Sequence, residues 1–313
     1  MKKIITNRKQ FIFVVGIAVG VFAVVLLLLY RIPQINTGNG KIHIVASFYP
    51  LSDVANVVGG NLVSVRNLVP AGVEPHDFEP SSRDLVEVGN ADVLIYNGGA
   101  LEPWVKKWDQ GISVRPKSVL NMTDLLKGQR VGLIENNGSI DPHFWLDPTI
   151  MKREVQIILG LLVQIDPAHK DIFTNNAKRF LISLDTLDSH FRTRLSSCTL
   201  RDVVVLHKAF DYLARQYNFS VTSIEGISPD EEPSPKELAR ITGLVRAKGV
   251  KYIFAETVAS PKFSELIARE VGGTTLVLNP LESLTPNEVQ LGEDYISIME
   301  MNLNNLQKAM LCN

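Results

Sequence analysis

The chain has 313 residues, 45% of them hydrophobic and 21% charged, which is an ordinary balance for a folded protein with room for two domains. A formal net charge of −1 gives no reason to expect a nucleic-acid partner. Only two cysteines occur, Cys198 and Cys312, so a disulfide framework and a cysteine-type zinc finger are excluded, while a single disulfide between them stays open.

The N-terminus has the pattern of a targeting segment. Residues 1–10 are basic, and residues 11–30 contain no charged side chain. A run of about 20 apolar residues is long enough to cross the ~30 Å hydrocarbon layer of a bilayer as a helix. We predict a transmembrane helix that serves as a signal anchor, with its basic end in the cytoplasm, followed by a linker over residues 31–41. The alternative is a long cleaved signal, which would leave a secreted or periplasmic protein.

From residue 42 onward, short apolar runs alternate with segments of helical spacing. This alternation is typical of a parallel sheet covered by helices. The expected strands span 43–47, 62–68 and 92–96, and the expected helices span 51–58, 83–88 and 101–108. A further strand is expected to begin at Val119, and the polar residues 126–141 are expected to form a surface loop.

The second half of the chain repeats the same order of elements after one long helix. Residues 168 to about 196 contain neither glycine nor proline, which predicts a helix of roughly 29 residues and some 40 Å. Beyond it, strands are expected at 202–206, 219–224, 252–255 and 275–278, and helices at 210–216, 238–247 and 295–311.

We therefore predict an α/β fold with two lobes, each a small mainly parallel sheet flanked by helices, joined by one long rigid helix. In this interpretation residues 42–167 form the N-terminal lobe, residues 168–197 the linking helix and residues 198–313 the C-terminal lobe.

Four side chains near the predicted ends of strands suggest a metal site. His76 and His143 lie in proline-containing loops of the first lobe, and His207 and Glu282 follow strands of the second. Open α/β sheets bind ligands beyond the carboxyl ends of their strands, so both lobes are expected to contribute to one site. Three imidazoles and a carboxylate suit zinc. Each histidine taken alone is more often a surface or capping residue, because no local metal motif is present.

Several groups of residues match one known family. The chain resembles the solute-binding proteins of ABC importers for transition metals, in the zinc and manganese family. The matching segments are Ala46-Ser47-Phe48-Tyr49-Pro50-Leu51, Gly72-Val73-Glu74-Pro75-His76-Asp77-Phe78-Glu79-Pro80 with Asp84, Asp92-Val93-Leu94-Ile95-Tyr96-Asn97-Gly98, Asp141-Pro142-His143-Phe144-Trp145-Leu146-Asp147-Pro148, Val204-Val205-Leu206-His207-Lys208-Ala209-Phe210, Glu232-Pro233-Ser234-Pro235 and Asn279-Pro280-Leu281-Glu282.

The resemblance implies a ligand set. The family's first three ligands fall on His76, His143 and His207; manganese-type members have a glutamate at the position of His207, so its imidazole favours zinc. Many members have an aspartate where this chain has Asn279, and the resemblance then implies Glu282 as the fourth ligand. Glu256 and a water molecule remain alternatives. The segment 111–140 lacks the histidines that zinc-type members often carry there, and the usual lipid anchor is also missing.

The resemblance implies a carrier and no enzyme. We expect an extracytoplasmic protein that binds Zn(II) with high affinity between its lobes and delivers it to an ABC permease in the membrane. We also expect a monomer with no nucleic-acid partner. The alternatives are a carrier of manganese or another divalent metal, a hydrolytic enzyme with zinc on three histidines, and an adhesin-like surface protein in which the metal is structural.

Overall fold

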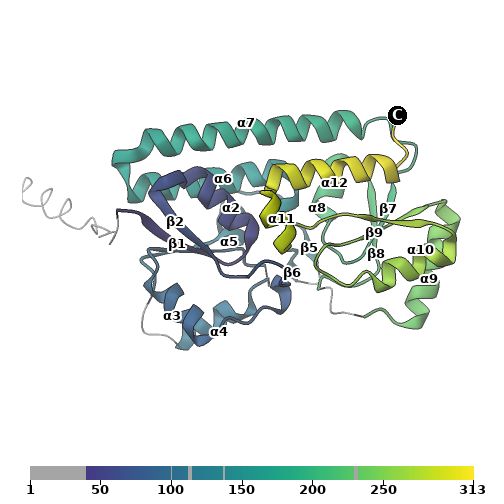
Figure 1. Ribbon diagram of the computed structural model, residues 1–313, viewed down its shortest axis with the longest axis horizontal. Coiled ribbons are helices and arrows are strands. Elements are labelled where there is room, and N and C mark those ends of the chain that lie inside the picture. The colour runs from purple at the N-terminus through teal and green to yellow at the C-terminus, as the bar shows by residue number, and fades with distance from the viewer. Residues whose placement is uncertain (1–39, 100, 112–114, 137, 229–231) are drawn as a thin grey trace, which may run out of the picture. The chain divides into compact units, whose positions relative to one another are not determined.

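Two four-stranded parallel sheets organise the chain (Figure 1). The structure is a computed structural model and describes residues 40–313 except 100, 112–114, 137 and 229–231. The predicted basic segment, membrane anchor and most of the linker therefore lie outside the described residues. Within the part that is described, no helix combines the length and the apolar character that crossing a bilayer requires.

The first sheet has the strand order β2-β1-β3-β4, with every neighbouring pair parallel. Its strands are β1 (Ile42–Ala46), β2 (Val63–Asn67), β3 (Val93–Tyr96) and β4 (Ser118–Asn121). The helices of this half are α2 (Tyr49–Gly59), α3 (Ser82–Asn90), α4 (Pro103–Gly111), α5 (Met122–Gly128) and α6 (Pro148–Ile165).

The second sheet has the strand order β10-β9-β7-β8 and is also parallel throughout. Its strands are β7 (Asp202–Val205), β8 (Ser220–Ser223), β9 (Tyr252–Ala255) and β10 (Thr274–Val277). The helices of this half are α8 (Asp211–Tyr217), α9 (Pro235–Lys248), α10 (Lys262–Val271), α11 (Pro286–Leu291) and α12 (Tyr295–Ala309).

The central strands are apolar on both faces, because helices cover both faces of each sheet. On β7, Val203 and Val205 belong to the main hydrophobic core, whereas Val204 points to a smaller core with Ile241 of α9 and Ile267 of α10. The first sheet has the same arrangement, and its second core includes Trp104 and Trp108 of α4. The main core is continuous from the first sheet to the second.

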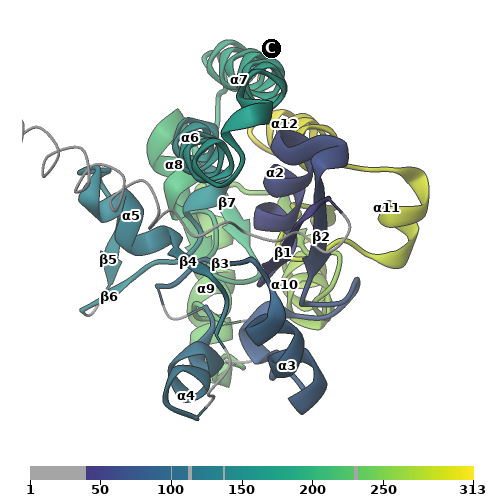
Figure 2. The ribbon, with the colours of Figure 1, turned by 90° about the vertical axis from the view of Figure 1, so that its left-hand side faces the viewer.

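One long helix, α7 (Lys170–Arg194), runs along both halves (Figure 1). It packs on α2 and α6 of the first half and on α12 of the second. Viewed from one end, α2, α6 and α7 lie on one side of the first sheet, and α3 and α4 lie on the other (Figure 2). The predicted α/β fold with two parallel sheets and one long helix is confirmed. The helix begins two residues later than predicted, because Pro167–His169 form a separate 3-10 turn, η4.

The polar segment 126–141 is more ordered than the predicted surface loop. It contains the end of α5 and a short antiparallel hairpin of β5 (Glu135–Asn136) and β6 (Ser139–Ile140). The Ile134 amide donates a hydrogen bond to the Tyr212 hydroxyl, and that hydroxyl donates to the Asp141 carbonyl. These two hydrogen bonds attach the segment to α8 of the second half.

The two cysteines form a disulfide. The Cys198–Cys312 bond joins the chain just after α7 to the C-terminal end of the sequence. The sequence left open whether these two cysteines pair, and in the structure they do.

Candidate metal centre

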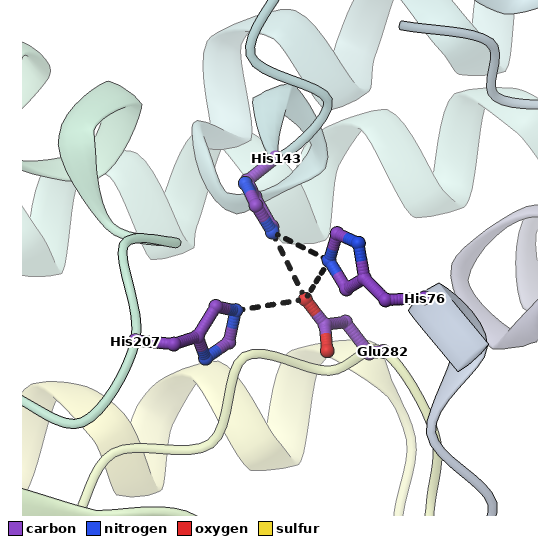
Figure 3. Close-up of side chains that lie close together, drawn as sticks. All are labelled: His76, His143, His207 and Glu282. Atoms are coloured by element: carbon purple, nitrogen blue, oxygen red, sulfur yellow. Dashed lines mark hydrogen bonds and ion pairs between the residues drawn. The ribbon is translucent and has the colours of Figure 1, made fainter. Parts of the chain in front are cut away.

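The side chains of His76, His143, His207 and Glu282 converge on one point (Figure 3). One ligand atom from each lies within 4.8 Å of those of the other three. The Glu282 Oε1 atom is 3.1 Å from Nε2 of His143, 3.2 Å from Nε2 of His207 and 3.5 Å from Nε2 of His76. The Nε2 atoms of His76 and His143 are 3.2 Å apart. The three histidines and the glutamate are between 0% and 7% exposed at their side chains.

His76 is placed by a short 3-10 turn in the loop after β2. This turn, η2 (Pro75–Asp77), begins with a proline, whose fixed φ suits the first position of a helical turn. The Glu74 carboxylate caps the turn by accepting a hydrogen bond from the His76 amide at 3.2 Å. The imidazole therefore projects from a locally ordered loop.

His143 is held by the aspartate two residues before it. The Asp141 Oδ1 atom lies 2.8 Å from Nδ1 and accepts from the backbone N–H of His143 at 3.0 Å. A bond at Nδ1 leaves the Nε2 lone pair directed at the centre of the site. The turn η3 (Phe144–Leu146) follows, and Asp147 then caps α6 through the Thr149 amide.

His207 follows β7 and is held in the same way by a residue that follows β9. Oε1 of Glu256 is 2.7 Å from Nδ1 of His207 and 3.2 Å from its backbone N. Glu256 was the alternative fourth ligand. Its carboxylate instead bonds to Nδ1 of His207, the ring nitrogen that faces away from the site, and is not among the four converging groups.

Glu282 comes from the loop after β10, in which the backbone is unusual. Leu281 has φ of +60°, the left-handed region that non-glycine residues seldom occupy. Its amide donates to the Asn279 side chain at 2.7 Å, and Trp145 Nε1 donates to the Pro280 carbonyl at 2.8 Å. Asn279 therefore shapes the loop and does not join the four converging side chains.

The ionisable groups at the site shift one another's pKa values. Burial raises the pKa of the Glu282 carboxyl, but the charge of His207 and the bonds from the histidines outweigh it and hold that pKa well below its usual range. Burial lowers the pKa of His207, but the charges of Glu256 and Glu282 raise it well above the ordinary value. Burial and the neighbouring Glu282 raise the pKa of Glu74 to about 9.

The geometry and the donor set fit one metal ion. A tetrahedral zinc ion with ligand bonds of about 2.0–2.2 Å separates its ligand atoms by roughly 3.3–3.5 Å. Four of the six separations between the ligand atoms are 3.1–3.5 Å, close to this range, and all six are within 4.8 Å. Carboxylates at Nδ1 of His143 and His207 orient each ring so that its Nε2 faces Glu282, and a metal ion would replace the protons through which these rings bond to that carboxylate.

Other histidines and acidic residues have partners away from the four converging groups. Glu79 forms an exposed ion pair with Lys107. His169 pairs with Asp166, and His190 pairs with Glu300. The sequence did not predict that Asp141 and Glu256 hold the imidazole rings of His143 and His207. The one local signal was the acid two residues before His143, and an acid at that position is also typical of a turn or a cap.

Known zinc-uptake and zinc-binding proteins match this chain. The family model described as "Zinc-uptake complex component A periplasmic", ZnuA, matches residues 44–309. The high-affinity zinc uptake system protein ZnuA of Bacillus subtilis is 34% identical over 281 residues, which cover 87% of this chain and 88% of that protein. The zinc-binding lipoprotein AdcA of Streptococcus pneumoniae is also 34% identical over 281 residues, and the match covers 87% of this chain but only 56% of AdcA.

A solved structure agrees with these matches. The Zn(II)-bound ZnuA-like domain of Streptococcus pneumoniae AdcA superposes with a TM-score of 0.76 at 35% sequence identity. The superposition covers 87% of this chain and 99% of that domain. The likeness to AdcA therefore concerns its ZnuA-like domain.

Proposed function

The chain belongs to the ZnuA family of zinc-uptake components, and from this membership we propose that it captures Zn(II) with high affinity and delivers it to an ABC permease. Zinc is then the transported ion. His76, His143, His207 and Glu282 are its four proposed ligands. The proposed lobes are residues 42–167 and 198–313, joined by residues 168–197, most of which form α7, and the ion is bound between the lobes.

The main support for the proposal is the convergence of three imidazoles and one carboxylate. Imidazole nitrogens suit zinc, whereas manganese prefers oxygen ligands. With one oxygen among four donors, the site favours zinc, and a manganese carrier is the second candidate. The buried carboxylates at Nδ1 of His143 and His207 support tight binding, because such partners fix the orientation of the ring and raise its basicity.

The same donor set supports a carrier over a hydrolytic enzyme. Catalytic zinc sites keep one coordination position open for water or substrate. In the proposed site Glu282 fills the position that a catalytic water would need. An enzyme on this scaffold would have to displace that carboxylate.

We place the folded part outside the cytoplasmic membrane, anchored by residues 11–30 or released if that segment is cleaved. The Cys198–Cys312 disulfide supports this compartment, because disulfides persist where the surroundings are oxidising. The proposed partner is the permease of an ABC importer. We propose that the protein acts as a monomer without nucleic acid.

Calorimetric titration of the purified chain with zinc tests the proposal. We expect saturable binding of one ion per chain, sharply weakened by His143→Ala. His169→Ala is a matched control, because His169 is half-exposed and paired with Asp166 away from the site; it should bind like the wild type. Absence of saturable one-to-one binding would refute the proposal.

A further inference from the structure

The loop that carries Glu282 is bound to the first half of the chain on both sides of the glutamate. Before it, the Pro280 carbonyl accepts the hydrogen bond from the Trp145 indole. After it, the Ser283 hydroxyl donates to the Pro70 carbonyl at 3.2 Å. Residue 70 belongs to the loop that delivers His76. The two loops that supply one donor each are therefore in direct contact.

Ser283 is the centre of that contact. Its hydroxyl also accepts from the Gly72 amide at 3.2 Å, and the same amide donates to the Leu284 carbonyl at 2.8 Å. Ser283 is 2% exposed, so water does not easily replace these bonds. Gly72 has φ of +80°, and a β-carbon there would lie 3.4 Å from Cδ of Pro286, so the two backbones approach closely.

We propose that Ser283 is a positioning residue that joins the His76 loop to the Glu282 loop and thereby slows the release of bound metal. The inference rests on the proposed function, since it assigns a role toward the same ion. Oε1 of Glu282 and Nε2 of His76 are 3.5 Å apart and belong to different halves of the chain. For the ion to leave, these donors must separate, and the bonds through Ser283 oppose that separation.

The variant Ser283→Ala removes the hydroxyl and leaves both ligands in place. A hydrogen bond of this kind contributes modestly to a folded protein, so we expect zinc to dissociate about threefold to tenfold faster. Zinc-loaded protein is mixed with excess chromophoric chelator in a stopped-flow instrument, and the rate of zinc transfer is recorded.

Ser264→Ala is the matched control. Ser264 is a buried serine of α10 whose hydroxyl donates to the Phe254 carbonyl at 2.9 Å, outside the loops that carry the ligands. Both variants lose a buried hydroxyl-to-carbonyl bond, and the Gly72 amide that also bonds Ser283 keeps the Leu284 carbonyl, so the thermal midpoints of the metal-free proteins should fall by similar amounts. Only Ser283→Ala should release zinc faster.

The outcomes separate this inference from the proposed function. If the wild-type chain binds no zinc, the proposed function fails. If the wild type binds zinc but Ser283→Ala releases it at the wild-type rate, the proposed role of Ser283 is wrong, and the proposed function as a zinc carrier is unaffected. An equal acceleration in Ser264→Ala would also overturn it, because general destabilisation would then explain the effect.

Discussion

The Oε1 atom of Glu256 lies 2.7 Å from Nδ1 of His207, on the side of the ring that faces away from the other three donors. Both side chains are buried, and they come from the ends of two neighbouring strands, β7 and β9. The bond fixes the ring so that Nε2 points at Glu282.

Glu256→Gln is expected to weaken zinc binding by about 10-fold to 100-fold, the usual cost of losing a charged partner behind a metal-bound histidine. The amide keeps a similar shape but removes the negative charge that supports the imidazole. Competition with a zinc chelator measures the affinity. Glu79→Gln, at an exposed ion pair, is the control, and equal affinities of the two variants would contradict the role of Glu256.

Zinc binding is expected to release protons near neutral pH. Burial lowers the pKa of His207, but the charges of Glu256 and Glu282 raise it well above the ordinary value of about 6.5. A raised pKa keeps the metal-free ring protonated to a higher pH, and zinc requires the unprotonated Nε2. Affinity should therefore fall as pH drops from about 8 to about 6.

Calorimetry in buffers of different ionisation enthalpy tests this expectation. The apparent binding heat should vary with the buffer, with a sign that reports proton release. An affinity that is constant over the same pH range would be inconsistent with a protonated His207 in the metal-free protein.

Asp53 is expected to make the fold less stable as pH rises. Burial, with the charge of Asp294, raises the pKa of Asp53 from 3.8 to about 7. The unfolded chain loses this proton near the lower value and the folded chain near the higher one, so stability declines between them and stays reduced above about pH 7.

Asp53→Asn should remove this loss, because an amide cannot ionise and still accepts a hydrogen bond. We expect the variant to gain roughly 1 kcal/mol or more over the wild type at about pH 8, with little gain at about pH 4. Urea unfolding at the two pH values measures the difference. Asp185→Asn, at an exposed pair with Lys152, is the control; an equal gain at both pH values would contradict the assignment.

Loss of the Cys198–Cys312 disulfide is expected to lower stability more than it lowers zinc affinity. The bond closes a loop with a sequence separation of 114, and removing such a link typically costs about 2–4 kcal/mol. A variant with both cysteines replaced by serine should unfold at lower urea concentration. Its zinc affinity should stay close to that of the wild type, because the disulfide joins segments away from the four ligands. A large loss of affinity would show that the chain end supports the site.

Local patterns were enough to predict most of the fold. In strands such as β7, valines on successive positions indicate a strand that is buried on both faces. The positions of His76, His207 and Glu282 beyond strands then placed them at the carboxyl ends of strands in the two lobes, and the structure brings these side chains together with His143.

Contacts between residues far apart in the chain could not be predicted from the sequence. Nothing near Tyr212 indicates that its hydroxyl accepts from Ile134 and donates to Asp141, so segment 126–141 was expected to be a plain surface loop. The partnership of Glu256 with His207 joins residues 49 positions apart. Such pairs depend on the order of strands within a sheet, which periodicity does not specify.

In the proposed function, one zinc ion is bound by His76, His143, His207 and Glu282 together. Crystals of the zinc-loaded protein, measured on both sides of the zinc absorption edge, test it most directly. We expect a single anomalous peak about 2.0–2.2 Å from Nε2 of each histidine and from a carboxylate oxygen of Glu282. A peak that lies elsewhere, or one from which any of the four side chains is turned away, would contradict it.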